Sequence, residues 1–532
     1  MTARRQTFLL VLLALAALLP GIWEATGLTG KDEFYLGLRT PMEMMAGDHW
    51  LVPFLDGAPR IRKPPLLYWL GRIDFELFGP SLLSARSLAV LFAALLVAAT
   101  AGIARRLTRE TPSGLVAGLI LLACLGLHTE GRRFMLDVPV AALSAAAFWS
   151  LLVWLDRRRW PWLTLSALLL VAGFLVKGPI VLLVCGGGIA ALLLSGRLQA
   201  AGLRPHWPSL SAHALLGLGL AVPWFVVVRL LYPEAAQNAF ADEVESRQFF
   251  HPTPEIVLGL INIALPWVFV FFAAAWAKRR QAHLPRLLLI WFLITFLPFL
   301  VIRSFDRYLV GSLVPLAIFV AIALPEIEAR WPFRLGLAIA LLLGGSLAGF
   351  AWWFGLGGWY WLPLPAAYFV WAWWRQRTLA HTAAAPVLYW IALLWGVFPA
   401  LGVNAVPAAV VALGRSHTIA MFDGPQPALL PILSQQPQRH YVALDRHDGA
   451  ELQALGALVF AESGDVPRLR EQLAAAGYEA TAAGTYQALA SHGSGLRFAR
   501  VGATLADWRK AFAGRSLDPL LTTVEWFEVR AR

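Results

Sequence analysis

The fold is decided near the amino terminus by the apolar stretch FLLVLLALAALLPGIW at residues 8–23. This run is close to the shortest length that crosses a bilayer as a helix. The preceding Arg4 and Arg5 give it the look of a signal peptide, but no clear small-residue cleavage site follows, so we expect a retained first helix. Next comes Asp32-Glu33, an acidic pair that is costly beside a bilayer unless it meets water, a cation or a bound molecule.

The composition of the whole chain is that of a polytopic membrane protein. Of its 532 residues, 58% are hydrophobic and only 14% are charged, whereas a soluble domain carries about 25% charged residues. The 24 Trp and 31 Phe suit a protein with two lipid–water interfaces. Both cysteines, Cys124 and Cys185, lie inside apolar runs, so we expect neither a disulfide nor a cysteine metal site.

About thirteen apolar spans are predicted, several of them near the lower length limit for crossing. If the amino terminus is cytoplasmic, strict alternation puts basic clusters such as Arg105-Arg106, Arg157-Arg158-Arg159 and Lys278-Arg279-Arg280 on that side, as the positive-inside rule requires, and the carboxyl terminus on the other. The membrane region covers residues 1–412, and its longest loop, 26–81, is expected to carry interfacial helices. After the first span, the predicted spans lie near 82–104, 113–128, 137–155, 161–176, 179–195, 210–231, 255–277, 287–302, 308–324, 335–353, 357–374 and 386–412.

Residues 413–532 have a different character, which predicts a small soluble α/β domain. Apolar runs there shorten to strand length at Tyr441–Leu444 and Ala457–Phe460, and they alternate with helical stretches such as Val466–Ala476. From Arg415 onward there are 12 basic and 12 acidic residues, so the net charge of +12 belongs to the membrane region. Its basic residues are dispersed between apolar spans, which argues against a nucleic-acid partner.

Three acidic residues beside the apolar spans are candidates for catalysis, namely Asp32, Glu33 and Asp137. Asp is a good helix N-cap and Glu is favoured in a first helical turn, so capping is an equally good explanation. The chemical interpretation rests on position, because Asp32 and Asp137 lie at the same predicted face. There they could bracket a reacting hydroxyl or phosphate.

Basic candidates reach the same face. Arg62 and Lys63 belong to RIRKPP at residues 60–65, where several cations within four positions favour a phosphate contact over interfacial snorkelling. Lys177 lies in FLVKGP, between two apolar runs, where Gly-Pro forces a turn. An ammonium group at that depth needs an anionic partner, so we favour a binding role.

Two further loops add polar candidates. Glu243 and Arg247 are four residues apart, where a helical salt bridge is the alternative to ligand binding. Arg303 and Tyr308 lie in a tight turn, where local Arg–Asp pairing is the alternative. Jointly, acids and cations reach one face from separate loops, which suits the charged headgroup of a membrane-embedded lipid.

The polar motifs also follow one another in a recognisable order, and together they resemble those of a known family. They are Asp32-Glu33, Gly47-Asp48, Lys63-Pro64 with Tyr68-Trp69, Asp137 with Pro139, Lys177-Gly178, Glu243 with Arg247, and Tyr308 with Pro315. Over residues 1 to about 330 the chain resembles the bacterial lipid-to-lipid glycosyltransferases typified by the aminoarabinose transferase that modifies lipid A. That family is related to the protein O-mannosyltransferases.

The resemblance implies a GT-C fold of about thirteen helices in a bacterial inner membrane. It also implies a polyprenyl-phosphate sugar donor, such as an undecaprenyl-phosphate sugar, and transfer to a lipid or other acceptor at the periplasmic face. Asp32 matches the family's catalytic position and Asp137 its second-loop acid. Lys177 and Arg247 match positions that contact the donor phosphate.

Two departures from the family pattern matter. Arg62 replaces a metal-associated acid, and Val244 replaces an expected His, so we expect no zinc and no other cofactor. Tyr35 stands where aminoarabinose transferases carry Arg, which makes it a candidate substrate contact and indicates a different sugar or acceptor.

Other functions compete with lipid glycosylation. Protein O-glycosylation is the activity of the mannosyltransferase relatives. A transporter would place ionisable residues near the midplane and show repeated halves, and neither feature is apparent here. A receptor domain on a helical anchor would leave the polar loop residues unexplained.

Overall fold

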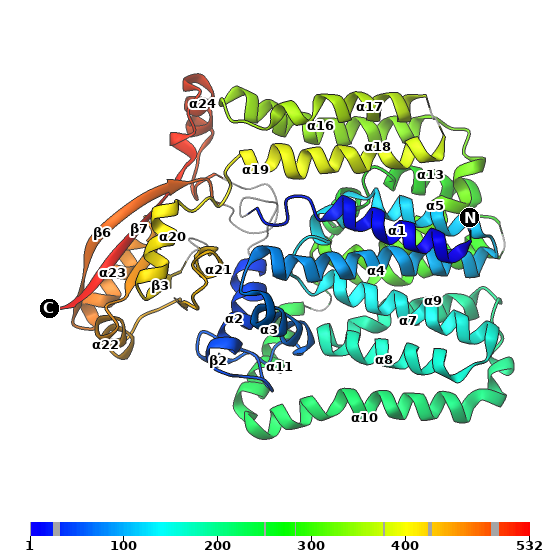
Figure 1. Ribbon diagram of the computed structural model, residues 1–532, viewed down its shortest axis with the longest axis horizontal. Helices are drawn as coiled ribbons and strands as arrows, with labels where there is room; N and C mark the ends of the chain where they lie inside the picture. The colour runs from blue at the N-terminus through cyan, green and yellow to red at the C-terminus, as the bar shows by residue number, and fades with distance from the viewer. Residues whose placement is uncertain are drawn as a thin grey trace.

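Long apolar helices build the larger part of the molecule, and a mixed β-sheet lies at one end of them (Figure 1). The computed structural model describes residues 2–24, 32–248, 250, 252–281, 283–375, 378–423, 428–490 and 499–532. The amino terminus lies at the end of the bundle away from the sheet (Figure 1). The chain is a multi-pass membrane protein, and the predicted fold class is confirmed.

Most helices of the bundle run back and forth along a common direction (Figure 1), and their apolar side chains pack together or face lipid. The main ones are α1 (Ala3–Leu18), α4 (Leu82–Thr108), α5 (Thr111–Leu122), α6 (Leu125–Glu130), α7 (Asp137–Arg157), α8 (Trp160–Lys177), α9 (Val181–Leu194), α10 (Trp207–Leu231), α12 (Ile256–Ala264), α13 (Val268–Lys278), α14 (Leu284–Phe296), α15 (Leu313–Ala323), α16 (Trp331–Trp353), α17 (Pro363–Trp374) and α18 (Leu379–Ile391).

In the described residues, eight helical stretches are long and apolar enough to cross a membrane. The pair α12 and α13, bent by 104°, would make a ninth if it counts as one span. Helix α5 is apolar but shorter, and α1 has 16 residues. The count of about thirteen spans therefore stays a prediction.

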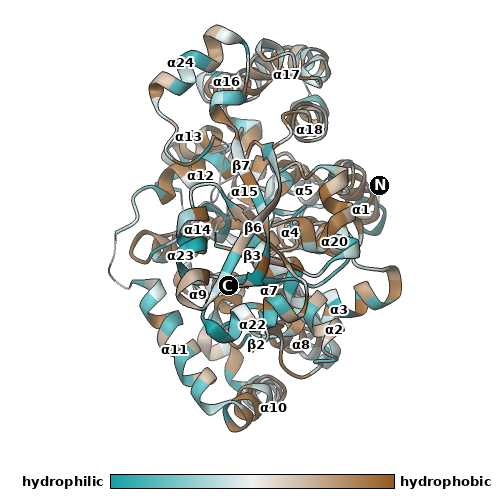
Figure 2. Ribbon diagram, turned by 90° about the vertical axis from the view of Figure 1, so that its left-hand side faces the viewer, coloured by the Kyte–Doolittle hydropathy of each residue, from teal (hydrophilic) through white to brown (hydrophobic). Residues whose placement is uncertain are grey.

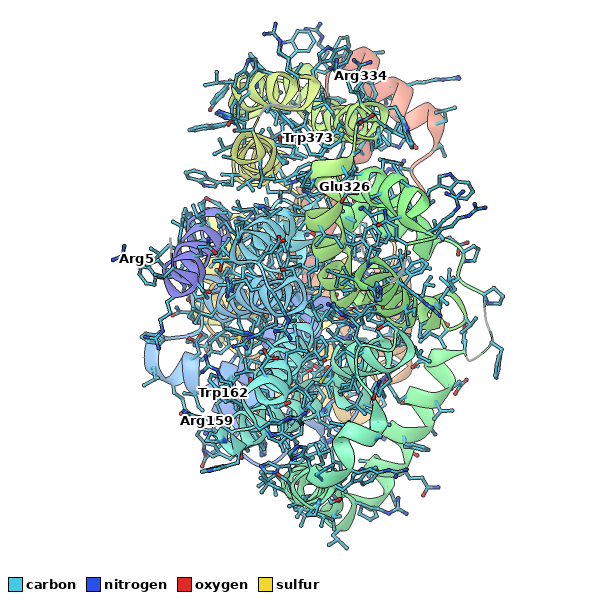
Figure 3. The ribbon with its side chains drawn as sticks, turned by 90° about the vertical axis from the view of Figure 1, so that its right-hand side faces the viewer. Arg5, Arg159, Trp162, Glu326, Arg334 and Trp373 are labelled. Carbon is cyan, nitrogen blue, oxygen red and sulfur yellow. The ribbon has the colours of Figure 1, made fainter. Side chains whose placement is uncertain are left out.

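The basic loops expected on one side meet at one end of the bundle. Arg105 donates to the Thr7 hydroxyl at 2.7 Å, and Arg106 pairs with Asp156 at 2.5 Å, so the loops that begin α1 and end α4 and α7 are neighbours. Figure 3 looks at this end, and Arg5 and Arg159 are labelled there. The polar site described below lies at the opposite end.

The first long loop is largely folded. A π-helical turn, Glu33–Leu38, continues into α2 (Arg39–Ala46), and α3 spans Leu66–Phe78. Between them a short hairpin pairs β1 (Phe54–Leu55) with β2 (Ala58–Pro59). Helices α2 and α3 lie in the loop, residues 26–81, where the sequence predicts interfacial helices.

The sheet region begins after α20 (Ala408–Ser416) and has the strand order β4-β3-β5-β7-β6. Strand β3 is parallel to β4 and β5, whereas β7 is antiparallel to β5 and β6. Its other elements are β3 (Ile419–Phe422), α21 (Leu430–Ser434), β4 (Arg439–Tyr441), α22 (Arg446–Ala454), β5 (Leu458–Glu462), α23 (Val466–Ala475), β6 (Tyr478–Ala488), α24 (Leu505–Gly514) and β7 (Thr522–Ala531).

One predicted strand is displaced. The sequence predicts a strand over Tyr441–Leu444, but β4 ends at Tyr441. Asp445 accounts for the shift, because its side chain accepts from the Asp448 N–H and closes a capping box that starts α22. The strand at residues 458–462 and the helix from Val466 agree with the prediction.

A buried polar contact joins the sheet region to the first loop. The Arg39 guanidinium, which is almost fully buried, donates to the Gln438 carbonyl at 2.8 Å and forms an ion pair with Asp56. Asp56 also accepts from the backbone N–H of His440 at 2.8 Å. The edge strand β4 is therefore held against the loop that begins with Asp32.

Candidate active site

A buried ion pair fixes the first loop beside the helices. Glu33 is completely buried, and each of its two carboxylate oxygens lies 3.0 Å from a guanidinium nitrogen of Arg86 on α4. Glu33 also accepts from the backbone N–H of Phe134 at 2.9 Å. This carboxylate therefore connects the first loop, α4 and the second loop, which is residues 131–136 between α6 and α7. It thereby holds Asp32 and Asp137 near one another.

The same arginine also binds the segment that follows α1. The remaining terminal nitrogen of Arg86 donates to the Ile22 carbonyl at 2.9 Å and to the Glu24 carbonyl at 2.8 Å. A buried guanidinium is tolerated because each of its three nitrogens donates to an acceptor.

Acidic and basic side chains alternate around the amino-terminal end of α7, which begins at Asp137. The Asp32 carboxylate lies 2.5 Å from the Arg307 guanidinium, whose Nε is 3.5 Å from Asp137. The Lys177 ammonium donates to the other oxygen of Asp137 and lies 4.0 Å from the centre of the Tyr308 ring. The side chains of Asp137 and Lys177 are only 5% and 4% exposed, whereas that of Asp32 is 37% exposed.

Lys177 reaches this position because the chain turns sharply after it. Helix α8 ends at Lys177, and Gly178 adopts a φ of 73°, which lies in the region that side chains other than glycine rarely occupy. Helix α9 then begins at Val181. The Gly-Pro turn predicted from the sequence therefore places the ammonium at the end of α8, beside Asp137.

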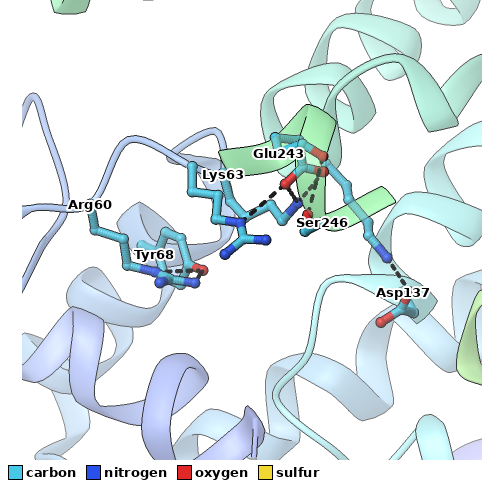
Figure 4. A network of polar contacts seen from close by, with 8 residues as sticks. Arg60, Lys63, Tyr68, Asp137, Glu243 and Ser246 are labelled. Atoms are coloured by element: carbon cyan, nitrogen blue, oxygen red, sulfur yellow. Dashed lines mark hydrogen bonds and ion pairs between the residues drawn. The ribbon is translucent and has the colours of Figure 1, made fainter. Parts of the chain in front are cut away.

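The rim of the site joins the first loop to α11 (Pro233–Arg247). The Lys63 ammonium lies 2.7 and 2.8 Å from the two carboxylate oxygens of Glu243, and the Arg62 Nε lies 3.3 Å from one of them. Arg60 donates to the Tyr68 hydroxyl at 3.2 Å. Figure 4 shows these contacts and Asp137.

These side chains surround a cavity of about 360 Å³, a volume within the usual range of small-molecule sites. Six cations and three carboxylates lie in its wall, which gives it an excess of positive charge. Its charged lining residues are Arg60, Arg62, Lys63, Lys177, Arg303, Arg307, Asp32, Asp137 and Glu243. Charge-assisted hydrogen bonds from such groups suit a phosphate, and the carboxylates are available for proton transfer.

Eight of the eleven residues singled out from the sequence line this one cavity. They are Asp32, Arg62, Lys63, Asp137, Lys177, Glu243, Arg303 and Tyr308. The side chain of Arg247 lies outside the part of the chain that the structure describes. The remaining two, Glu33 and Tyr35, lie elsewhere.

Glu33 lies apart from the cavity, because its carboxylate is enclosed by Arg86 and the Phe134 N–H. Its catalytic role and the substrate contact of Tyr35 stay predictions, and Tyr35 does not line the cavity either. It is buried against the sheet region, with its ring centre 5.2 Å from that of His440. Burial raises the pKa of the Tyr35 hydroxyl above its usual range, although the nearby Arg39 opposes the shift.

Sequence reasoning missed the central cation of the site. Arg307 contacts both Asp32 and Asp137, but its neighbour Asp306 suggested a local pair. Asp306 instead accepts from Asn262 at 3.3 Å and from the Arg307 backbone N–H at 2.8 Å. Arg60 is one cation of the basic run at residues 60–65, and the sequence does not single it out from the others. Neither residue carried a signal beyond its place at the shared face.

The residues at the family's metal position do not fit a metal. Glu243 is contacted there by two cationic side chains, Lys63 and Arg62, and a metal cation would compete with both for the same carboxylate. Within the described residues, no group of three or more His, Cys, Asp or Glu side chains could hold a metal ion. No step below therefore involves a metal.

The chain is similar to known membrane glycosyltransferases in sequence and in fold. Residues 62–226 match the model of the dolichyl-phosphate-mannose-protein mannosyltransferase family. The structure is similar to the crystal structure of ArnT from Cupriavidus metallidurans in the apo state, with a TM-score of 0.71, 17% identity, and coverage of 91% of this chain and 97% of that one. The chain has a GT-C fold.

A second structural relative covers nearly the whole molecule. ArnT from Cupriavidus metallidurans bound to undecaprenyl phosphate has a TM-score of 0.68 and 17% identity and covers 98% of both chains. The sheet region is thus included in the likeness.

Curated relatives match at the level of sequence. The undecaprenyl phosphate-alpha-4-amino-4-deoxy-L-arabinose arabinosyl transferase 1 of Sodalis glossinidius is 28% identical over 338 residues, which is 57% of this chain and 59% of the relative. The corresponding transferase of Pseudomonas aeruginosa strain LESB58 is 28% identical over 368 residues, which is 65% of this chain and 63% of the relative. The chain thus matches only about three fifths of the length of these relatives. The predicted resemblance to the aminoarabinose transferases is confirmed.

Proposed function

We propose that this protein is an inner-membrane glycosyltransferase that moves a sugar from undecaprenyl phosphate, or a similar polyprenyl phosphate, to a lipid A-like acceptor. The observation that carries the proposal is the single cavity in which Asp32 and Asp137 meet a ring of cations. The relatives support the donor class, because two of them are transferases whose names specify an undecaprenyl-phosphate sugar.

The cations serve the leaving group. When the bond between the sugar's anomeric carbon and the phosphate oxygen breaks, the electron pair stays on the polyprenyl phosphate. Lys63, Arg62 and the exposed Arg303 are cavity cations that can neutralise it. Lys177 is more deeply buried than Lys63, at 4% against 18% side-chain exposure, and one of its three N–H groups is held by Asp137, so it contributes from the cavity wall.

The carboxylates serve the acceptor. If the acceptor is a hydroxyl, Asp32 takes its proton while the acceptor oxygen forms the new bond to the anomeric carbon. Arg307 orients Asp32, and together with Lys177 it holds Asp137 in the cavity wall. Partial positive charge that develops at the sugar in the transition state is stabilised by the same carboxylates.

The proposed topology follows from the two ends of the bundle. The end with Arg105 and Arg106 is cytoplasmic by the positive-inside rule, and the cavity end, with residues 413–532 as a separate α/β domain, is periplasmic. A donor headgroup in the outer leaflet would then meet the cavity directly.

The test is a transfer assay with the purified full chain in lipid nanodiscs. Radiolabelled undecaprenyl-phosphate aminoarabinose and other undecaprenyl-phosphate sugars are offered one at a time with lipid A, because the chain matches the aminoarabinose transferases over only about three fifths of their length. We expect label to move from the donor to the acceptor lipid with at least one sugar. Label that stays on every donor, or appears only as free sugar, would contradict the proposal.

A second function is protein O-glycosylation. The observation that favours it is the match of residues 62–226 to the protein mannosyltransferase family model. Parallel reactions that replace lipid A with Ser/Thr-containing peptides distinguish the two functions, since each predicts label in a different acceptor.

A further inference from the structure

Helix α24 (Leu505–Gly514), far along the chain from the last membrane span, has an apolar stripe with cations close to it. Leu505, Trp508 and Phe512 recur at a spacing of three and four residues and so share one helix face. At 3.6 residues per turn, Arg509 flanks this stripe on one side, and Arg515 follows directly after the helix ends. Aromatic and aliphatic residues with cations close to them are typical of helices that lie in a membrane interface.

The helix is docked on the end of a membrane span. The Trp353 indole N–H at the end of α16 donates to the Phe512 carbonyl at 3.0 Å, and the Phe512 ring centre lies 5.2 Å from that of Phe354. The Arg515 guanidinium lies 4.5 Å from the centre of the Trp353 ring. Figure 1 shows α24 beside this end of α16 and across its direction.

Exposed aromatic residues indicate where this end of α16 lies relative to the membrane. Trp352, Tyr360 and Trp361 are all exposed and lie at or just after the end of α16. Trp and Tyr concentrate where lipid meets water, so this end of α16 lies at the membrane interface. Helix α24 is packed against the neighbouring Trp353 and therefore lies at the same depth.

Apolar residues of this segment remain uncovered by protein. Leu505 is 67% exposed, and Val501, just before the helix, is 71% exposed. Figure 2 colours part of α24 as hydrophobic at the outside of the molecule. Large apolar side chains next to a membrane boundary need a partner other than water.

We infer that α24 is a membrane-surface anchor that inserts Leu505 and Val501 among lipid chains and places Arg509 and Arg515 at anionic headgroups. A lipid surface is the partner because the exposed stripe continues the aromatic belt of α16. The nearby cations also complement lipid phosphates. The sheet region is then held by the bilayer through α24 and by the first loop through Arg39.

The experiment uses the full chain in nanodiscs, with an environment-sensitive fluorophore on a single introduced cysteine. Leu505→Cys is compared with Lys510→Cys, which is exposed on the same helix but lies about 140° further round it. The native Cys124 and Cys185 are buried, and labelled wild-type chain gives the background. Nanodiscs with and without brominated acyl chains provide the quencher.

We expect the label at residue 505 to emit at shorter wavelength and to lose intensity with brominated lipid, while the label at 510 does neither. A label at residue 505 that behaves like the one at 510 would overturn the inference, whether both are quenched or neither is. A third site on the sheet region, Glu471→Cys on α23, gives the fully aqueous reference. The measurement does not depend on the proposed enzyme activity.

Discussion

Two groups of buried charges lie at the same end of the molecule and differ in one respect. The Glu33–Arg86 pair is enclosed by protein, and its hydrogen bonds are made to α4, the first loop and the second loop. The Asp137–Lys177–Arg307 group is somewhat less buried and borders a cavity. Burial of an ion pair therefore does not by itself make its members candidates for catalysis, and contact with the cavity is what distinguishes the second group.

The largest loss of activity is expected when Asp32 is changed. Asp32→Asn removes the proposed base, so we expect the transfer rate to fall by about 10²–10⁴-fold. The side chain is 37% exposed, so thermal stability should change little. Asp48→Asn is the matched control, because Asp48 is an exposed acid of the same loop that does not line the cavity. Equal rates for wild type and Asp32→Asn would remove this residue from the chemistry.

Glu33 should show the opposite behaviour. Arg86→Leu leaves a buried carboxylate without its cation, and we expect a loss of about 3 kcal/mol in the free energy of unfolding. The double variant Glu33→Gln with Arg86→Leu should be less destabilised than Arg86→Leu alone, because no uncompensated charge remains. Thermal unfolding in detergent measures both. A stable Arg86→Leu protein would show that the pair does not hold the loop.

Among the cavity cations, Lys63 should matter most for the donor. Lys63→Ala removes an accessible ammonium, and we expect donor-lipid binding to weaken by about 10- to 100-fold, the size of a charge-assisted hydrogen bond. Arg106→Ala, at the other end of the bundle, should leave donor binding unchanged. Titration of fluorescent undecaprenyl phosphate in nanodiscs gives the affinities. Equal affinities for the two variants would place the phosphate elsewhere.

Arg62→Gln is expected to have a smaller effect. The Arg62 side chain is 42% exposed and that of Glu243 is 28% exposed, so solvent screens their ion pair. We expect a loss of less than about 1 kcal/mol in donor binding, or roughly fivefold. A larger loss, measured in the same titration, would mean that Arg62 contacts the phosphate directly.

The sequence predicted the class of fold and most of the site, but not the contacts within it. Apolar periodicity and the basic loops located the spans and brought Asp32, Lys63 and Lys177 to one end, because alternation of spans is a one-dimensional property. Which way a side chain points after the first span depends on a π-helical turn that the pattern does not specify. The sequence therefore did not predict that Glu33 and Tyr35 lie away from the cavity.

Long-range pairing was the other missing information. Arg307 has an acid next to it in the chain, yet it reaches Asp32, 275 residues away. The distance between these side chains is set by the packing of the η5 turn (Asp306–Ser312) on α7 and α12, which no local motif records. The presence of Asp306 beside Arg307 in a tight turn is therefore weak evidence that their side chains form an ion pair.

The smallest effect is expected from metal removal. The rim carboxylate that a metal would need is Glu243, and Lys63 and Arg62 already supply positive charge to it. Incubation with a strong chelator, followed by the transfer assay, should leave the rate unchanged, and elemental analysis of the purified protein should find no stoichiometric zinc. If chelation abolished transfer and zinc alone restored it, the two cations would have to move away from Glu243 in the working enzyme. Arg62→Asp sharpens the test, because an acid at this position adds the oxygen ligands that zinc binds and should create zinc affinity that the natural chain lacks.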